Sequence, residues 1–182
     1  QKIKLTCSLR VRDKELNTIE EIVKDSVGIV DGILILMGDK SNTSQDKTNL
    51  IPSQIVTSLN DKGFGEKLEL FLSIPSTPNF TKIQKKINAK PKGFFTQVIN
   101  SKALVQRITD YLNPKGFRII PCLLFPSEKN LKSAEFLNID WSNYKDNFML
   151  FVNEIHNLTH DILITSPNDF KGARASLSKI VS

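Results

Sequence analysis

Long hydrophobic runs are absent from this sequence. Apolar stretches such as "GILILM" at residues 32–37 are far shorter than the ~20 residues that a bilayer-spanning helix needs, and no secretory hydrophobic segment opens the chain. Hydrophobic residues make up 40% of the chain and charged residues 24%, which is the ordinary balance of a soluble globular protein. The sequence therefore predicts a cytoplasmic protein with no membrane partner.

Cysteine and histidine are also scarce. The two cysteines, Cys7 and Cys122, lie in the apolar stretches "KLTCSL" and "IIPCLL", and the two histidines form no cluster with the spacing of metal ligands. We expect both thiols to be reduced and buried in strands. We expect neither a disulfide nor a metal site.

A strong excess of one charge is missing as well. The net charge of +6 results from 25 basic and 19 acidic residues, which are spread along the chain. No aromatic-rich RNA-binding signature accompanies them, so nucleic acid is not an expected partner. A small anion, such as a phosphorylated cofactor, needs only a local basic cluster.

The glycine-rich phosphate loops GxGxxG and GxxxxGK[ST] do not occur, so the usual dinucleotide and nucleoside triphosphate sites lack support. Instead, short apolar runs alternate with segments of helical spacing, which is typical of a parallel sheet covered by helices. The apolar runs predict six strands, at residues 3–7, 32–37, 68–74, 93–98, 117–124 and 161–165. Helical spacing occurs at residues 16–23, 51–59, 83–87, 104–112, 131–137, 141–156 and 173–180.

Six βα units fit two architectures. An open doubly wound sheet uses six strands, whereas a (β/α)8 barrel needs two further units. In both architectures, ligands bind just beyond the carboxyl ends of the strands. The residues at the predicted strand ends are therefore the candidate site.

The stretch "DGILILMGDK" at residues 31–40 ends a predicted strand in Gly38 and Asp39. Two interpretations of Asp39 stay open: a turn or helix-cap residue, or the only carboxylate among the predicted strand ends. Thr6 and Gln97 end two other predicted strands, and the carboxamide of Gln97 both donates and accepts hydrogen bonds. One acid, one amide and few other charges suit a planar heterocycle such as a pterin or a flavin.

Four phrases occur in order along the chain: "KLTC", "DGILILMGD", "KIQKKINAKPKGFFTQ" and "GFRIIPCLLFP". Together they resemble methylenetetrahydrofolate reductase, a flavin-dependent (β/α)8 TIM barrel of one-carbon metabolism and methionine biosynthesis. The resemblance runs from the family's third strand to its last. It implies that residues 1–182 form a single barrel domain that is N-terminally incomplete, with the first two βα units preceding Gln1.

The resemblance also implies a function and a set of site residues. The enzyme would reduce a methylene-tetrahydropterin to the methyl form, with FAD as cofactor and NAD(P)H as co-substrate. Asp39 would be the catalytic residue, tuning the flavin and contacting the pterin or folate. Gln97 would hold the pterin, Thr6 and Gly38 would contact the flavin, and the general acid would lie outside this sequence.

Lys86 matches a lysine of the family that supports the phosphate side of the flavin, where it would act as a charge partner. A second interpretation is a solvated helix face, because five lysines lie close together here. They are Lys82, Lys85, Lys86, Lys90 and Lys92.

Several positions depart from the family pattern. The resemblance implies that four family residues which anchor FAD or folate are lost here, each with a polar contact. The residues at these positions are Lys4, Met37, Ile74 and Asn79. These departures leave an alternative open: a divergent, non-catalytic TIM-barrel pterin-binding protein, or a subunit of a one-carbon complex that has lost flavin binding. In either case the chain can pair with copies of itself or with a partner subunit.

Overall fold

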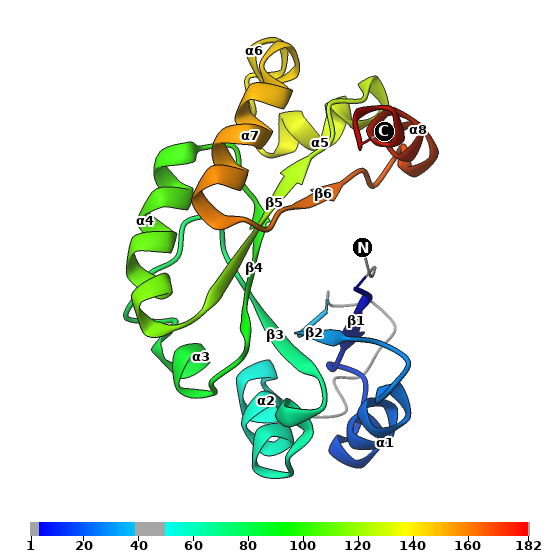
Figure 1. The fold of residues 1–182 in the computed structure, drawn as a ribbon, viewed down its shortest axis with the longest axis vertical. Coiled ribbons are helices and arrows are strands. Elements are labelled where there is room, and N and C mark those ends of the chain that lie inside the picture. The colour runs from blue at the N-terminus through cyan, green and yellow to red at the C-terminus, as the bar shows by residue number, and fades with distance from the viewer. Residues whose placement is uncertain (1–3, 39–49, 182) are drawn as a thin grey trace. The chain divides into compact units, whose positions relative to one another are not determined.

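The computed structural model describes residues 4–38 and 50–181. Its strands lie in the order β1-β2-β3-β4-β5-β6, and the pairs β1–β2, β2–β3 and β5–β6 are parallel (Figure 1). Helices connect successive strands, so the chain has the parallel α/β fold that the sequence predicts. This architecture is consistent with part of a (β/α)8 barrel, and the count of eight βα units stays a prediction.

The chain divides into two compact units, residues 1–95 and residues 96–182, which we call unit 1 and unit 2. The division falls inside one strand, β4 (Gly93–Val98). The single domain expected over residues 1–182 stays a prediction.

The strands of unit 1 pair in chain order. β1 (Thr6–Arg10) pairs with β2 (Gly32–Leu36), and β2 pairs with β3 (Glu69–Ile74). β2 and β3 are rich in aliphatic residues and mostly buried, as expected of strands covered on both faces. In β1, by contrast, four of the five residues are exposed. The core of unit 1 therefore lies around β2 and β3.

Each longer helix of unit 1 buries one apolar face. In α1 (Leu16–Ser26) the buried residues are Ile19 and Val23, four positions apart and so on one side of the helix. α2 (Pro52–Asp61) begins with a proline, which suits the first turn because the N–H that it lacks would have no helical partner there. The other helical segments of unit 1 are η1 (Phe64–Glu66) and α3 (Gln84–Asn88).

Unit 2 is built around β5 (Arg118–Leu124), which is buried from its second residue onward. β5 pairs with the short strand β6 (Leu163–Thr165). α4 (Lys102–Leu112) packs against β5 and against α7 (Phe148–Thr159), and the Ser101 hydroxyl caps its first turn. The remaining elements are η2 (Asn113–Lys115), η3 (Glu128–Asn130), α5 (Leu131–Phe136), α6 (Trp141–Asp146) and α8 (Phe170–Val181).

One predicted helix is in fact two. The apolar spacing over residues 141–156 predicts a single helix, but α6 and α7 are separated at Asn147. Asn147 leaves helical geometry, with φ −105° and ψ 10°, and its side-chain Nδ2 donates to the carbonyl of Asn143 at 2.9 Å. The side chain thus binds a carbonyl of the preceding turn and competes with the helix backbone.

β1 lies further along the chain than the apolar run predicts. The expected strand covers residues 3–7, whereas the observed strand runs from Thr6 to Arg10. The reason is that the alternation continues through Leu9 and Val11, whose side chains are buried. Thr6 therefore begins the strand and does not end it.

The two cysteines differ in exposure. Cys7 is exposed on β1, so the expectation of a buried thiol is wrong there. β1 is the first strand in the sheet order, and four of its five residues, Cys7 among them, are exposed. Cys122 is buried on β5 as expected, and burial raises the pKa of its thiol to about 11.

Within residues 4–38 and 50–181, no helix is both long and apolar enough to cross a membrane. No group of three or more His, Cys, Asp or Glu residues in the same ranges is placed to hold a metal ion.

Candidate functional site

Two of the predicted cofactor-binding residues lie at carboxyl ends of strands in unit 1. Gly38 follows the end of β2, and Nζ of Lys86 donates a hydrogen bond to the carbonyl of Ser73 near the end of β3. This contact leaves Lys86 half-buried, and burial lowers the pKa of its ammonium group. Lys86 is therefore not a freely solvated lysine of a helix face. The roles of Gly38 and Lys86 toward FAD stay predictions.

The other predicted site residues have different positions. Thr6 pairs with Gly32 at the start of β1, about 13 Å along the strand from its carboxyl end at ~3.3 Å per residue. Gln97 is exposed near the end of β4. Asp39, the expected catalytic residue, lies outside the described residues. The roles of Thr6, Gln97 and Asp39 stay predictions.

A charged cluster that the strand prediction missed follows β1. Arg10 ends the strand, and Arg12, Asp13 and Lys14 come directly after it, so three cations accompany one carboxylate. Nε and Nη2 of Arg10 donate to Oδ1 and Oδ2 of Asp13 at 3.4 and 3.3 Å, and Nζ of Lys14 lies 3.7 Å from Oδ1. The hydrogen bonds from Arg10 hold the pKa of the Asp13 carboxyl below its usual range, so it stays ionised. The available signal was "SLRVRDK", in which the alternation of the strand continues into basic residues.

Gly38 makes room for the side chain of Arg10. The φ of Gly38 is +84°, a conformation that residues with a Cβ rarely adopt. A Cβ at this position would also lie 2.2 Å from both Cγ and Cδ of Arg10. The stem of Arg10 therefore crosses from the end of β1 and packs on the backbone that follows β2.

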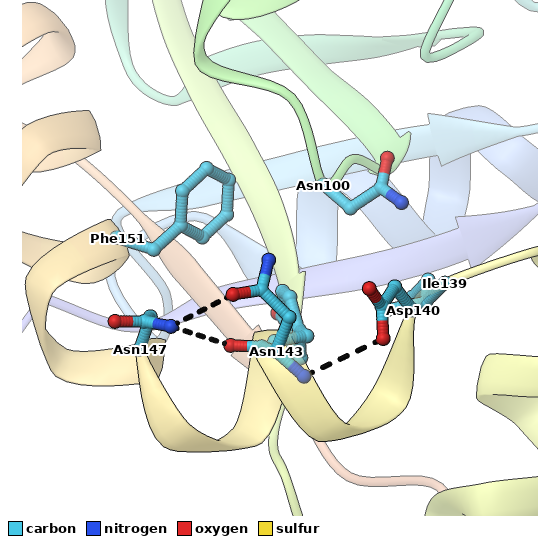
Figure 2. Close-up of a pocket in the computed structure, with 7 residues that line it drawn as sticks. Asn100, Ile139, Asp140, Asn143, Asn147 and Phe151 are labelled. Atoms are coloured by element: carbon cyan, nitrogen blue, oxygen red, sulfur yellow. Dashed lines mark hydrogen bonds between the residues drawn. The ribbon is translucent and has the colours of Figure 1, made fainter.

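Unit 2 has a cavity of about 160 Å³ at the carboxyl ends of β4 and β5 (Figure 2). Asn100 follows β4, and the hydroxyl of Tyr144 donates to the carbonyl of Leu124, the last residue of β5, at 2.9 Å. The cavity is smaller than the ~300–1,000 Å³ of sites for drug-sized ligands, so it suits a small metabolite. The residues that line this pocket are Asn100, Ile139, Asp140, Asn143, Tyr144, Asn147 and Phe151.

The polar part of the pocket lining is mainly three carboxamides, those of Asn100, Asn143 and Asn147. Nδ2 of Asn147 donates to both the carbonyl oxygen and Oδ1 of Asn143, each at 2.9 Å. Because Oδ1 of Asn143 accepts this bond, its Nδ2 is directed away from Asn147, toward the side of the pocket where Phe151 and Asn100 lie (Figure 2). The pocket thus offers oriented N–H donors together with carbonyl acceptors.

Two aromatic rings form apolar walls of the same pocket. The rings of Tyr144 and Phe151 pack edge to face, with centroids 5.9 Å apart. Burial raises the pKa of the Tyr144 hydroxyl well above its usual range, and this hydroxyl is bonded to Leu124. Tyr144 therefore stays protonated and shapes the pocket, but it is not placed to transfer protons.

Asp140 is the only carboxylate among the described residues that line the pocket. It caps α6, because Oδ1 accepts the backbone N–H of Asn143 at 3.5 Å. This bond is at the long limit of hydrogen bonding, and the residue is exposed. The carboxylate therefore keeps acceptor capacity for a ligand.

A buried amide links the chain segments that follow β5 and β6. The side chain of Asn130 is fully buried, and its Nδ2 donates to the carbonyl of Phe125 at 3.0 Å and to Oγ of Ser166 at 2.9 Å. Its Oδ1 accepts the backbone N–H of Asn168 at 3.1 Å. Three bonds from one side chain hold the two segments in a single arrangement.

A carboxylate lies beside this amide network. Asp169 accepts hydrogen bonds from the hydroxyl of Ser127 and from Nζ of Lys129. These bonds, that from Ser127 first, hold the pKa of the Asp169 carboxyl below its usual range. Asp169 is therefore ionised near neutral pH and fixes the segment before α8.

Comparisons with known proteins show that the fold of this chain is similar to that of a solved structure. No protein-family model matches the chain, and no curated protein matches it. A solved structure of 3-keto-L-gulonate-6-phosphate decarboxylase from Vibrio cholerae O1 biovar El Tor str. N16961 matches with a TM-score of 0.50 and 11% sequence identity. The match covers 98% of this chain and 97% of that chain. At this identity the likeness concerns the fold alone.

This match contradicts the resemblance to methylenetetrahydrofolate reductase, because the matching structure is a decarboxylase. The expected FAD-dependent reduction of a methylene-tetrahydropterin is therefore wrong. The predictions of a flavoprotein and of a role in one-carbon metabolism are wrong for the same reason. The physical reason is that the four phrases mark buried strands and the turns after them, which one fold shares across many chemistries. No comparison bears on FAD or NAD(P)H as ligands, or on partners, and these stay predictions.

Proposed function

We propose that this chain is a (β/α)-barrel enzyme whose substrate, a small hydroxylated carbonyl compound, binds in the pocket of unit 2. The observation that carries the proposal is the placement of three asparagine carboxamides around one cavity at the carboxyl ends of β4 and β5. This end of the strands holds the substrate in barrel enzymes. The matching structure supports an enzyme at the level of fold, and its name gives 3-keto-L-gulonate-6-phosphate as what that decarboxylase acts on.

The lining of the pocket favours hydroxyl and carbonyl groups as the bound chemistry. Nδ2 of Asn143 donates to a carbonyl or hydroxyl oxygen, and the carboxamide of Asn100 both donates and accepts. The ring of Phe151 offers an apolar wall for the C–H face of such a molecule. None of the described residues that line the pocket is Lys or Arg, so the lining offers no cation to a carboxylate or phosphate group.

Asp140 is the group that performs acid–base chemistry in this proposal. Its carboxylate accepts a proton from a carbon or hydroxyl next to the substrate carbonyl, and the resulting carboxylic acid returns the proton in the second half of the reaction. The amides of Asn100 and Asn143 stabilise the negative charge that develops on the carbonyl oxygen meanwhile.

A binding experiment tests the pocket. Saturation-transfer NMR with a panel of aldoses, ketoses and sugar acids, each with and without a phosphate group, identifies ligands, and calorimetry then gives their affinities. Asn143→Leu removes an oriented donor and should weaken binding at least ~10-fold. Asn153→Leu, an exposed position on α7, is the matched control and should bind normally. Equal binding by the two variants, or no ligand in the panel, would contradict the proposal.

A proton-exchange experiment tests the reaction. In D2O, the wild-type protein should exchange the proton next to the carbonyl of a bound ligand, as followed by loss of its NMR signal. Asp140→Asn keeps a good helix cap and should bind the ligand but exchange it at least ~100-fold more slowly. Exchange at the wild-type rate in Asp140→Asn would remove Asp140 from the mechanism while leaving the pocket in place.

A further inference from the structure

We propose that unit 1 contains a binding site for a free amino acid with an aliphatic side chain, in a second pocket at the amino ends of β1, β2 and β3. Leu5 and Asp31 directly precede β1 and β2, and Glu69 begins β3. The pocket has a volume of about 490 Å³, within the ~300–1,000 Å³ of sites that hold small molecules. It is formed by residues of unit 1 alone, so the proposal is independent of the function proposed for unit 2.

The first observation is that Asp31 is held in place while part of its carboxylate is unused. Its Oδ2 accepts the backbone N–H of Leu5 at 2.8 Å. Its backbone N–H donates to the carbonyl of Leu5 at 2.8 Å, and its own carbonyl accepts the N–H of Glu69 at 2.9 Å. Oδ1 of this half-buried residue has no hydrogen bond among the residues that the structure describes. Asp31 therefore presents a pre-positioned acceptor to an ammonium group.

The second observation is that the pocket holds one carboxylate and one ammonium group without an ionic partner. Glu69 has such a partner, since Nζ of Lys4 lies 3.5 Å from its Oε1. Asp31 and Lys67 form no ion pair with each other or with any other residue in the ranges 4–38 and 50–181. A ligand with a single charge would meet a like charge at one of these two positions. A zwitterion satisfies both, and an amino acid is the simplest one.

The third observation is an apolar surface beside these charges. The side chains of Ile29 and Leu5 line the pocket and are 73% and 50% exposed. Ile29 lies in a turn after α1 that two hydrogen bonds fix, because the N–H groups of Ile29 and Val30 both donate to the carbonyl of Ser26 at 3.1 Å. A ligand side chain that covers this surface removes apolar area from water, which favours an aliphatic amino acid over glycine or serine.

The three observations assign one contact to each part of the ligand. Its ammonium group binds Oδ1 of Asp31, and its carboxylate binds Nζ of Lys67. Its aliphatic side chain packs on Leu5 and Ile29.

Calorimetric titration with L-leucine tests the site. Lys67→Met removes the charge and keeps most of the stem, and it should weaken leucine binding at least ~10-fold. Asp31→Asn keeps an acceptor for the N–H of Leu5 and should weaken binding by a similar factor. Two exposed residues outside the pocket, Lys85 on α3 and Asp25 on α1, provide the controls.

Lys85→Met and Asp25→Asn make the same changes of charge and should bind leucine as the wild-type protein does. Circular dichroism confirms that each variant is folded. The proposal would be overturned if leucine at ~10 mM gave no binding to the wild-type protein, or if the pocket variants bound as tightly as their controls.

Two analogues of leucine identify the group that each residue recognises. Isocaproate lacks the ammonium group and isoamylamine lacks the carboxylate, so each should bind the wild-type protein at least ~10-fold more weakly than leucine. Lys67→Met should not weaken isoamylamine further, and Asp31→Asn should not weaken isocaproate further, because the contact is already missing. An equal loss for all three ligands in either variant would overturn the proposal.

Discussion

The polar side chains that follow β1 in unit 1 and those that follow β5 in unit 2 differ in how deeply they are buried. In unit 1 they are charged, and the Arg10–Asp13 pair is long and partly exposed. In unit 2 the carboxamide of Asn130 is fully buried and makes three hydrogen bonds, although the charged residues Glu128 and Lys129 also follow β5. A buried polar group costs stability unless its bonds are complete, whereas an exposed charge keeps much of its hydration. The buried amide of Asn130 therefore fixes the segments that follow β5 and β6, whereas the Arg10–Asp13 pair stays partly in contact with solvent.

The cysteines provide the largest contrast between the units. Cys7 is exposed in unit 1, whereas Cys122 is buried in unit 2 with a pKa raised to about 11. At pH 8 only about 0.1% of the Cys122 side chain is thiolate. DTNB at pH 8 should therefore modify Cys7 at least ~100-fold faster than Cys122, and peptide mass spectrometry identifies the modified residue. Only the slow phase should remain in Cys7→Ser; rapid labelling of that variant would show that unit 2 opens readily.

Asn130→Leu should give the largest loss of stability. The substitution removes three hydrogen bonds and leaves groups such as the carbonyl of Phe125 and the N–H of Asn168 without this partner. At about 1 kcal/mol for each bond, the free energy of unfolding should fall by about 3 kcal/mol. Urea denaturation measures the change. Asn153→Leu on the exposed face of α7 is the control, and a loss below about 1 kcal/mol in Asn130→Leu would show that the network is not a main source of stability.

Gly38→Ala should cost about 2 kcal/mol, because the alanine must adopt a positive φ and must also displace Arg10. The two causes are separable in a double-mutant cycle with Arg10→Ala. In the Arg10→Ala background the clash is gone, so the same substitution should cost only about 1 kcal/mol. Equal costs in both backgrounds would mean that the stem of Arg10 moves aside freely.

The smallest expected effect is the pH dependence of the stability that the Ser127–Asp169 hydrogen bond provides. The Ser127 hydroxyl lowers the pKa of Asp169 below its ordinary value of 3.8, so this hydrogen bond stabilises the fold fully above that value. Its contribution is lost as the pH falls through the lowered pKa of the folded protein. The difference in unfolding free energy between wild type and Ser127→Ala should therefore be largest above pH 5 and should shrink toward pH 2–3. A difference that grows on acidification would have the wrong sign for this assignment.

The periodicity of the sequence was sufficient for most elements. Strands β2 to β6 and the helical segments between them follow from apolar runs and from spacing of three to four residues. Two elements were predicted with wrong bounds: β1, and the single helix over residues 141–156. Both errors have one cause, because a hydrophobic pattern shows which side chains face a core but not where the backbone geometry changes. The apolar face of α7 continues in the sequence of α6, yet Asn147 interrupts the helix between them. In β1, the alternation of inward and outward side chains continues to Arg10, beyond the apolar run.

The position of a residue at a strand end was predictable where that strand end was predicted correctly, while the role of such a residue toward a ligand stays a prediction. Gly38 follows such an end, but Arg10 was missed because its strand was expected to end at Cys7. Asn143 and Asn147 were missed for another reason. They lie about 20 residues beyond β5, and only the hydrogen bond from Tyr144 to Leu124 shows that this part of α6 lies beside the end of that strand.

The contact between Gly38 and Arg10 has a consequence for the evolution of this fold. While Arg10 is kept, position 38 is restricted to glycine, since a side chain at 38 and a long stem at 10 occupy the same volume. In a set of related sequences, the two positions should covary: glycine at 38 should accompany long side chains at 10, and larger residues at 38 should accompany short ones. A count of residue pairs at two alignment columns would then indicate which relatives retain the guanidinium in this position.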